Sequence, residues 1–513
     1  MKRKITIALF LITLSQARAQ DLLQPILEIQ PLHSGMQLGE FSLGLGDING
    51  DGYPDFAVSR DSNLTYIYFG GPGIFDGVPD VTIHGGGMMA MGDLNGDGKM
   101  DLIVHTEGDT LGIQYIYVYF GKSAPGLMLD TTPDLKIREE KGTTEFGYSF
   151  AVGDLNGDGF DDLVVGAPFY GDLGKTYLYF GKSTMTSNPD FSVIGGDSMY
   201  DDYGIRVKIA DINGDGIKDL AIGADRKKQE ATLDIYYGKP GFTFTKENYS
   251  QRLTPSNTGL RGIFWFNLLD VNNDGKVDLS CPDSGKEYFF FGKADSLSLK
   301  PSLVLIPDPN SSGNYYGDPA QDIGDVNNDG KRDFALRAGS SPCAYVFLGG
   351  SFIQNSRVAG RCNSSDVGSA LETITAVGDV NGDGVNDFAT GIPSDGIPGI
   401  VQDGYFVIYS GNKKWVTSVK KEVQQPEAFR LYQNYPNPFN PQTTISYNVA
   451  TRGFVKLKVY DLLGREVGTL IKQMKEPGLH QVPFDATGLP SGLYFYQLIL
   501  NGQIQTRKML FLQ

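Results

Sequence analysis

Seven short acidic stretches carry the residues best suited to chemistry in this chain. Each reads D-x-N-x-D-G-x-x-D, and the seven copies begin at Asp47, Asp93, Asp154, Asp211, Asp270, Asp325 and Asp379. Oxygen ligands at alternate positions of a tight loop converge on one point, and glycine at the sixth position permits the sharp turn. Carboxylates and an amide carbonyl are hard ligands, which suit calcium better than zinc or copper. The pattern therefore predicts seven calcium-binding loops.

The predicted ligands are the side chains at loop positions 1, 3, 5 and 9 and the main-chain carbonyl at position 7. In chain order they are Asp47, Asn49, Asp51, Tyr53, Asp55, Asp93, Asn95, Asp97, Lys99, Asp101, Asp154, Asn156, Asp158, Phe160, Asp162, Asp211, Asn213, Asp215, Ile217, Asp219, Asp270, Asn272, Asp274, Lys276, Asp278, Asp325, Asn327, Asp329, Lys331, Asp333, Asp379, Asn381, Asp383, Val385 and Asp387. Nothing beside them resembles a base or a nucleophile, so up to seven structural Ca²⁺ ions are expected. Seven solvated turns without metal are the alternative, but the crowded carboxylates would then repel one another.

Two other acidic motifs are excluded. An EF-hand needs Glu at position twelve and a helix on each side. Here position twelve is Val58 in the first repeat and Val165 in the third, and the flanking segments have the composition of strands. Dockerin-type modules place similar strings in closely spaced helical pairs, whereas these copies lie 46 to 61 residues apart. The loop is therefore interpreted as the turn of a β-hairpin.

The repeat period predicts the fold of residues 39–412. In the third unit an apolar segment at 148–152 precedes the loop, a second follows at 163–168, an aromatic strand ends at Gly181, and a weaker strand lies at 191–194. Four short strands per unit are typical of a propeller blade, and seven blades that close into a ring leave no exposed sheet edge. The predicted fold is an all-β, seven-bladed β-propeller with calcium loops.

Residues just before each loop bear on how the blades pack. The residue two positions before the first Asp is apolar in every copy, which predicts one shared core of Leu45, Met91, Val152, Ile209, Leu268, Ile323 and Val377. One position earlier, three consecutive blades carry Lys208, Asn267 and Asp322. These three either line a central channel or form a local hydrogen-bonded cluster. We favour the cluster because buried polar groups are usually paired.

The last blade lacks an outer strand in its own stretch of sequence. Either residues 26–30 or residues 415–420 could supply it. A strand from the opposite end of the chain would tie both termini together, so the N-terminal segment is favoured.

Composition limits the classes of function. The chain has 513 residues and a formal net charge of −16. The loops supply 21 of the 60 acidic residues, so the acidity is mostly local, and it argues against a nucleic-acid partner. The four histidines (His33, His84, His105 and His480) are little material for a transition-metal or imidazole-based site.

The two ends of the chain differ from the repeats. Residues 1–19 combine a basic start, an apolar run and Ala17-Arg18-Ala19, which is the pattern of a secretory signal peptide. That run is too short to span a bilayer, which needs about 20 residues, and no other segment is long enough. The predicted domains are a signal peptide at 1–19, the propeller at 20–412, a linker at 413–428 and a small immunoglobulin-like β-sandwich at 429–513. After signal removal the chain is not expected to span a membrane.

The third unit resembles the FG-GAP repeat, which builds the seven-bladed propeller of integrin α-subunits and of many bacterial surface proteins. The matching residues are Phe146-Gly147, the loop from Gly153 to Gly159, and Val164-Val165-Gly166-Ala167-Pro168. The Gly-Ala-Pro element is complete only here, and 223–225 and 391–393 are partial copies. The resemblance implies the propeller fold rather than any particular integrin-like ligand.

The C-terminal domain resembles the sorting domain of the type IX secretion system of Bacteroidetes-type bacteria. The matching residues are 431–441 (LYQNYPNPFNP), 459–467 (VYDLLGREV), 491–496 (SGLYFY) and Lys508-Met509. The resemblance implies that residues 429–513 engage the type IX machinery. The protein would then be secreted or held at the outer-membrane surface. An ordinary fibronectin-like binding module is the alternative.

The cysteines permit one disulfide. Cys343 begins the sixth aromatic strand and Cys362 ends the segment that returns beside it, so the two are plausible cross-strand neighbours in an exported protein. Cys281 is expected to be a buried free thiol.

Three functions stay open. The favoured one is a non-catalytic adhesion or glycan- or protein-binding module, with its ligand opposite the metal loops or at the channel mouth, because segments 139–144 and 197–202 differ between blades. A polysaccharide lyase or esterase on the same scaffold is the alternative. No Ser/His/Asp order or nucleophile elbow supports an enzyme, although His84 and His105 near the second repeat could be paired. A passive scaffold within a cell-envelope assembly is the third.

Overall fold

The structure is a computed structural model. It describes residues 11–13, 23, 25–29, 38–60, 63–72, 77–107, 112–122, 130–140, 145–195, 201–225, 230–306, 318–338, 343–350, 358–363, 371, 373–392, 404–413, 415, 430–434, 436–449, 452–462, 464–475, 478–500 and 503–512. The chain divides into two compact units, Met1–Ser418 and Val419–Gln513. Most of the predicted signal peptide and of the predicted linker lies outside the described residues.

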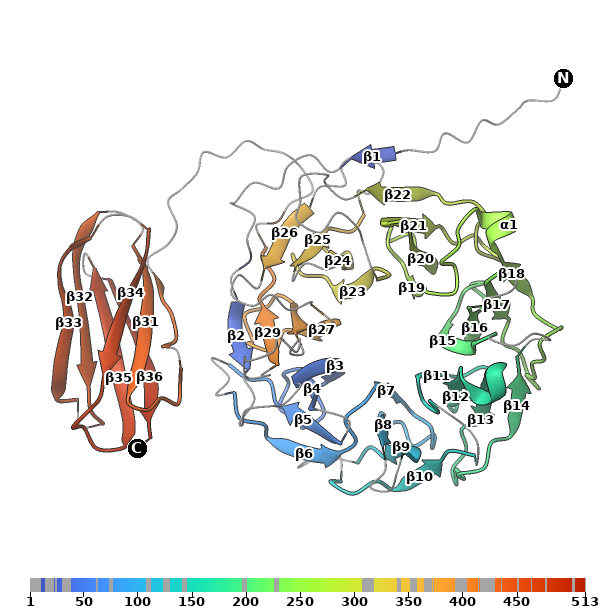
Figure 1. Cartoon of the computed structure of the whole chain (residues 1–513), viewed down its shortest axis with the longest axis horizontal. Coiled ribbons are helices and arrows are strands. Elements are labelled where there is room, and N and C mark those ends of the chain that lie inside the picture. The colour runs from blue at the N-terminus through green and yellow to red at the C-terminus, as the bar shows by residue number, and fades with distance from the viewer. Residues whose placement is uncertain are drawn as a thin grey trace. The chain divides into compact units, whose positions relative to one another are not determined.

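The first unit is a β-propeller, shown as a ring of sheets in Figure 1. Blade 1 contains β3 (Leu38–Gly46), β4 (Asp55–Arg60), β5 (Leu64–Tyr68) and β6 (Val81–His84). Blade 2 contains β7 (Met89–Gly92), β8 (Asp101–Glu107), β9 (Gln114–Tyr119) and β10 (Leu135–Arg138). Blade 3 contains β11 (Ser149–Gly153), β12 (Asp162–Ala167), the short 3-10 helix Tyr170–Asp172, β13 (Lys175–Tyr179) and β14 (Phe191–Ile194). Blade 4 contains β15 (Tyr203–Ala210), β16 (Asp219–Ala224), β17 (Thr232–Tyr236) and β18 (Gln251–Leu253), followed by α1 (Pro255–Thr258).

The other three blades have the same order of strands. Blade 5 contains β19 (Asn267–Leu269), β20 (Asp278–Asp283), β21 (Lys286–Phe290) and β22 (Leu303–Ile306). Blade 6 contains β23 (Gln321–Gly324), β24 (Asp333–Ala338), β25 (Cys343–Phe347) and β26 (Val358–Asn363). Blade 7 contains β27 (Thr373–Gly378), β28 (Asp387–Ile392) and β29 (Tyr405–Tyr409). The described residues thus form seven sheets of the predicted kind.

The ring closes through a strand from the start of the chain. β2 (Pro25–Ile29) pairs antiparallel with β29, so the sheet order in blade 7 is β2-β29-β28-β27. The N-terminal closing strand is therefore confirmed. β1 (Leu11–Thr13), which falls within the predicted signal peptide, runs parallel to β22 at the outer edge of blade 5.

The core of the propeller lies between the blades. Alternate residues of one strand face opposite neighbours: Leu163 and Val165 pack toward blade 2, whereas Val164 packs toward blade 4. Strands buried on both faces explain the continuous apolar runs in the sequence. The prediction of one shared core is wrong, because Leu45, Ile323 and Val377 belong to three different clusters between blades.

Topology places every acidic loop on one face. The first strand of each blade is the innermost strand in Figure 1, and each loop joins it to the antiparallel second strand. The loops therefore all follow the same end of the inner strands. On the opposite face the second strands end, and the third strands and the inner strands begin.

Two expectations about side-chain neighbours are wrong. Lys208, Asn267 and Asp322 do not form one cluster: Asn267 Nδ2 donates to the carbonyl of Ala320 at 2.9 Å, and Asp322 pairs with Arg332. Cys343 lies opposite Asn363, and Cys362 lies opposite Ala344, so these cysteines are not direct cross-strand partners. Counting residues outward from the turn predicts that Cys343 lies opposite Cys362. A register shift between Val346 and Phe347 moves every later pair by one residue, so this prediction fails.

Cys281 is a buried free thiol, as expected. It lies in the cluster of apolar residues between blades 4 and 5.

The second unit contains two sheets around one core. β30 (Arg430–Leu431), β31 (Gln442–Val449) and β34 (Gly478–Asp485) form one sheet. β32 (Gly453–Tyr460), β33 (Glu466–Lys475), β35 (Gly492–Leu500) and β36 (Gln503–Phe511) form the other. Both sheets contribute residues to a single apolar cluster, so this unit is a β-sandwich. An immunoglobulin-like strand arrangement stays a prediction.

The proline-rich motif that opens this sandwich is held by a residue of the later Gly-Leu-Tyr-Phe-Tyr motif. Tyr496 Oη donates to the carbonyl of Tyr432 at 2.8 Å and lies 2.7 Å from the amide nitrogen of Asn434. Asn434 is buried, and its side chain bonds Thr443 Oγ1 at 2.9 Å. Two motifs far apart in the sequence therefore form one structural unit.

Candidate metal centres

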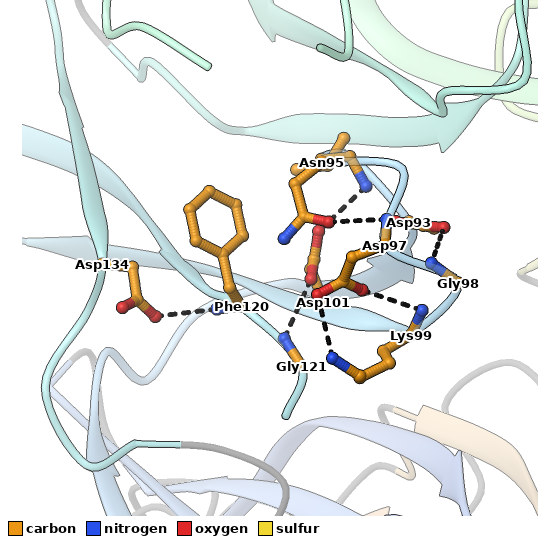
Figure 2. Close-up of polar contacts among 10 residues, drawn as sticks. Asp93, Asn95, Asp97, Gly98, Lys99, Asp101, Phe120, Gly121 and Asp134 are labelled. Carbon is orange, nitrogen blue, oxygen red and sulfur yellow. Dashed lines mark hydrogen bonds and ion pairs between the residues drawn. The ribbon is translucent and has the colours of Figure 1, made fainter. Parts of the chain in front are cut away.

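Each acidic loop is folded by its own side chains. In repeat 2 (Figure 2), Asp93 accepts the amides of Asp97 at 3.0 Å and Gly98 at 2.8 Å. Asn95 Oδ1 also accepts the Asp97 amide, at 2.9 Å, and Asp97 Oδ1 accepts the Lys99 amide at 3.0 Å. The same four bonds recur in the other six loops. Positions 1, 3 and 5 therefore lie around a shared turn, as the spacing predicted.

Position 4 of each loop requires the left-handed backbone region. Glycine occupies it in five copies, for example Gly50 with φ 77°. Asn273 and Asn328 occupy it in repeats 5 and 6, with φ 56° and 59°, and asparagine tolerates this region better than most residues. Asn273 also bonds the next blade, because its Oδ1 accepts the Arg332 amide at 2.7 Å and its Nδ2 donates to the Arg332 carbonyl at 3.0 Å.

Position 9 has a role that the sequence analysis missed. Asp162 is fully buried, and its two oxygens accept backbone amides from different strands. Oδ2 accepts the Leu155 amide of its own loop at 3.0 Å, and Oδ1 accepts the Gly181 amide at the end of the aromatic strand, also at 3.0 Å. Repeats 1, 2, 4, 5 and 6 have the same pair of bonds. In six repeats, position 9 thus fastens the loop to the third strand of its blade.

The electrostatics of position 9 differ from those of the exposed ligands. Burial raises the pKa of Asp162 to about 7, against the lowering effect of its two amide bonds, and the charges of Asp158 and Asp154 raise it further. The pKa of Asp55 rises to about 6 and that of Asp278 to about 7, again with burial as the main cause. A cation beside the loop would favour the charged carboxylate.

The seventh repeat departs from this pattern. The Val380 amide donates to Gly378 at 2.9 Å instead of to the position-9 carboxylate. Oδ2 of Asp387 is buried and has no hydrogen-bond partner among the described residues. A buried carboxylate oxygen without a partner is costly, and a cation is one group that would satisfy it.

The donor set fits a hard cation. Positions 1, 3 and 5 supply two carboxylates and an amide oxygen, and position 7 adds a carbonyl, all of them oxygen donors of the kind calcium prefers. Within the described ranges, no three Asp, Glu, His or Cys side chains group as a metal cluster by themselves. Position 3 of each loop is an amide rather than a carboxylate, and in six repeats the carboxylate at position 9 accepts two backbone amides of its own blade. Positions 1 and 5 are then the two carboxylates that remain at the turn. Calcium at the loops, with position 9 as a ligand, stays a prediction.

Neighbouring loops are bonded to one another around the ring. The Asp161 amide donates to the carbonyl of Asp93 at 3.0 Å, and the Lys182 amide donates to that of Leu94 at 2.9 Å. The Gly71 amide of blade 1 donates to Val380 of blade 7 at 3.0 Å, which continues the series across the closure. The geometry of one loop is therefore coupled to that of the next.

The histidines near repeat 2 are placed apart from the loops. His105 is half-buried against Gly87 and Gly147, and the desolvation of its ring lowers its pKa to about 4. His84 is exposed at the end of β6, where its carbonyl accepts a bond from Tyr119.

Comparison with known protein families gives three matches along the chain. Residues 47–104 match an FG-GAP-like repeat, residues 146–179 match the FG-GAP repeat, and residues 433–512 match a secretion system C-terminal sorting domain. The chain contains FG-GAP repeats and ends in a sorting domain. The sorting domain indicates a secreted or cell-surface protein. Among the residues with a described structure, no helix has the length and apolar character needed to cross a membrane.

The FG-GAP repeats relate the chain to integrin α-subunits. Integrin alpha-V of Gallus gallus is 33% identical over 178 residues, which are 31% of this chain and 16% of the integrin. Integrin alpha-7 of Homo sapiens is 34% identical over 200 residues, which are 36% of this chain and 16% of the integrin. The chain thus spans about a sixth of the length of these relatives.

A solved structure of BBS1N in complex with ARL6DN, soaked with lead, covers 82% of this chain and 91% of its own. Its identity is 9% and its TM-score is 0.35, which is too low to infer fold or function.

Proposed function

We propose that this secreted or cell-surface propeller is a non-catalytic binding protein, with structural Ca²⁺ in up to seven loops. The observation that carries the proposal is the contrast between its two faces. Four loop hydrogen bonds are the same in all seven copies, and they use side chains that a hard cation would bind. Uniform loops on one face are suited to holding blades together rather than to recognising a ligand.

The opposite face supports the binding role. Exposed aromatic side chains lie there in blade 3, with Tyr148 just before β11 and Phe169 just after β12. Their rings meet edge to face, with centroids 6.0 Å apart. The blades differ in this region, and loops carried by a rigid scaffold are where binding residues concentrate. An extracellular glycan or protein is the proposed class of ligand.

The sorting domain bears on how this binding protein is exported. We infer that residues 429–513 engage the type IX secretion machinery and deliver the propeller to the cell surface or the medium. The two bonds that join the 431–441 motif to Tyr496 support this, because a recognition signal needs a fixed shape.

The test uses the purified full chain in calcium buffer, applied to glycan and protein arrays and, in parallel, to polysaccharides followed by product analysis. The proposal expects binding without cleavage. Shortened polymers or released acyl groups would contradict it and favour the polysaccharide-acting enzyme. Retained binding after substitutions at Tyr148 and Phe169 would place the ligand elsewhere.

A further inference from the structure

Aromatic and charged side chains from blades 3 to 6 lie near the starts of the inner strands, on the face opposite the acidic loops, and Lys208 lies further along its strand, three residues before Asp211. Tyr148 precedes β11, Arg206 and Lys208 lie on β15, Trp265 precedes β19, and Asp318 precedes β23. With Phe169 after β12, these residues are called the rim cluster below. They come from four consecutive blades, and the packing of each blade on the next places them on one face.

Arg206 is held in place but keeps a charge without a direct counter-ion. Its Cζ lies 4.5 Å from the centre of the Trp265 ring, and its Nε donates to the carbonyl of Phe266 at 3.1 Å. Trp265 Nε1 in turn donates to Asp318 Oδ1 at 3.2 Å. Asp318 forms its ion pair with Arg337. In the described part of the chain, no carboxylate forms an ion pair with Arg206. A β-bulge between Tyr203 and Arg206 marks this end of the strand.

Lys208 adds a second cation on the same side of β15, because residues two apart in a strand share a face. Its side chain is half-buried, and no hydrogen bond or ion pair to it is found among the described residues. Burial, and then the charge of Arg206, lower the pKa of Lys208 to about 7. Two like charges side by side are unfavourable, and an anion between them would relieve the repulsion.

The local charge is opposite to that of the whole protein. The rim cluster contains two cations, Arg206 and Lys208, and one carboxylate, Asp318, which is paired with Arg337, so its excess charge is positive in a chain of net charge −16. The opposite face of the propeller carries three carboxylates in each acidic loop and repels an anionic ligand, so within the propeller this region is where one would be concentrated.

The exposed aromatic rings point to the class of anion. Tyr148 and Phe169 are 40% and 41% exposed and lie beside each other. Ser149, the neighbour of Tyr148, donates its Oγ hydrogen bond to the carbonyl of Gly204 at 3.0 Å, which brings the start of β11 beside the segment of β15 that carries Arg206. Side chains of this kind combine an apolar ring face with polar edges, and a sugar ring has the same combination. A sugar that carries a carboxylate would use both parts of the cluster.

We propose that the rim cluster binds a carboxylated polysaccharide, with a uronic-acid carboxylate at Arg206 and Lys208 and a sugar ring against Tyr148 or Phe169. This inference rests on the proposed binding function and gives it a ligand class. It commits to a carbohydrate rather than an acidic peptide because the solvent-exposed part of the cluster is aromatic.

The experiment measures binding of the full chain to polygalacturonate, alginate and hyaluronate, and to the carboxyl-reduced form of each. We expect at least one uronate polymer to bind, and its carboxyl-reduced form to bind at least tenfold more weakly. Lys208→Met should weaken binding by about tenfold or more, which is the range of a lost charge-assisted contact. Tyr148→Ala should weaken it several-fold. Both variants should fold, because Lys208 has no bonded partner and Tyr148 is half exposed.

The controls are matched in side-chain type and blade. Lys239→Met removes an exposed lysine of blade 4 on the loop face, and Phe191→Ala removes an exposed ring of the outer strand of blade 3. Neither should change affinity. Equal binding to the carboxyl-reduced polymers, or full affinity in Lys208→Met, would overturn the inference while leaving the binding function intact. Binding of poly-glutamate as tightly as of the uronates would overturn the carbohydrate assignment. If no uronate polymer binds, the inference fails, and the protein array decides separately whether the binding function survives.

Discussion

Substitution of the acidic residue at position 5 and of the one at position 9 should change the stability of the protein in different ways, because the two side chains have different surroundings. Asp162 at position 9 is buried and accepts two buried amides, whereas Asp158 at position 5 is exposed and accepts the Phe160 amide at 3.0 Å. If position 9 mainly fastens the loop to the blade, its removal must cost stability with or without metal. If position 5 mainly binds metal, its removal must matter only when calcium is present.

The magnitude follows from the amides left behind. Asp162→Ala removes the acceptor of the Leu155 and Gly181 amides, and each buried amide without a partner costs about 1–3 kcal/mol. The expected loss is therefore about 2–6 kcal/mol in free energy of unfolding. Asp158→Ala leaves the exposed Phe160 amide to water, so in chelator the substitution should cost close to zero, and the relief of repulsion among the loop carboxylates offsets part of that cost.

The assay is thermal unfolding of the full chain at one scan rate, in calcium and in excess chelator, for wild type and both variants. Asp162→Ala should lower Tm in both buffers, and Asp158→Ala should lower it only in calcium. A harmless Asp162→Ala in chelator would refute the fastening role. Equal losses for the two variants in both buffers would refute the division of roles between the positions.

Four further outcomes are expected. Chelation should lower Tm of the wild-type propeller, and an unchanged melting curve would contradict calcium binding. Gly96→Ala should cost about 1–3 kcal/mol, because a Cβ there would lie 2.3 Å from the Phe160 ring. The control Gly98→Ala should cost less in the same denaturant titration, since it meets the same positive φ but no neighbouring atom. Burial raises the pKa of Glu287 well above the ordinary glutamate value of 4.5, so the folded protein keeps a proton that the unfolded chain releases above that pH. Stability should then fall as pH rises, and Glu287→Gln should raise Tm at neutral pH with little gain at pH 4. A chain lacking 429–513 should stay inside the cell on fractionation, and its appearance in the medium would contradict the sorting role.

The loops were predictable because their information is local. Nine residues contain the spacing of positions 1, 3 and 5, the turn glycine and the hairpin context, so the loop geometry around Asp93 follows from the string itself. The four-strand unit was predictable for the same reason. The closing strand β2 followed from the need to complete the last sheet.

The rest depended on contacts between distant segments. Nothing in the string around Asp162 states that Gly181 will donate to it, because that bond exists only once the third strand has paired. Asn267 bonds Ala320 and Asp322 pairs with Arg332, and both partners belong to blade 6. The spacing of the repeats in the sequence does not indicate either contact. The Cys343 register was offset by an irregularity that leaves no mark in composition. Position 4 did carry a signal: asparagine replaces glycine in repeats 5 and 6, where it bonds the next blade.

The bonds between loops bear on why all seven repeats keep the same acidic string. Blade 3 donates to the carbonyls of Asp93 and Leu94 in the loop of blade 2, from Asp161 in its own loop and from Lys182 after β13, and blade 1 donates to Val380 across the closure. A distorted loop would therefore disturb the loop before it as well as its own hairpin. The residues of the opposite face differ in type between blades, for example Tyr148, Arg206 and Trp265 near the starts of three successive inner strands. Because that face does not repeat one sequence from blade to blade, a site such as the rim cluster can be built into an otherwise uniform ring.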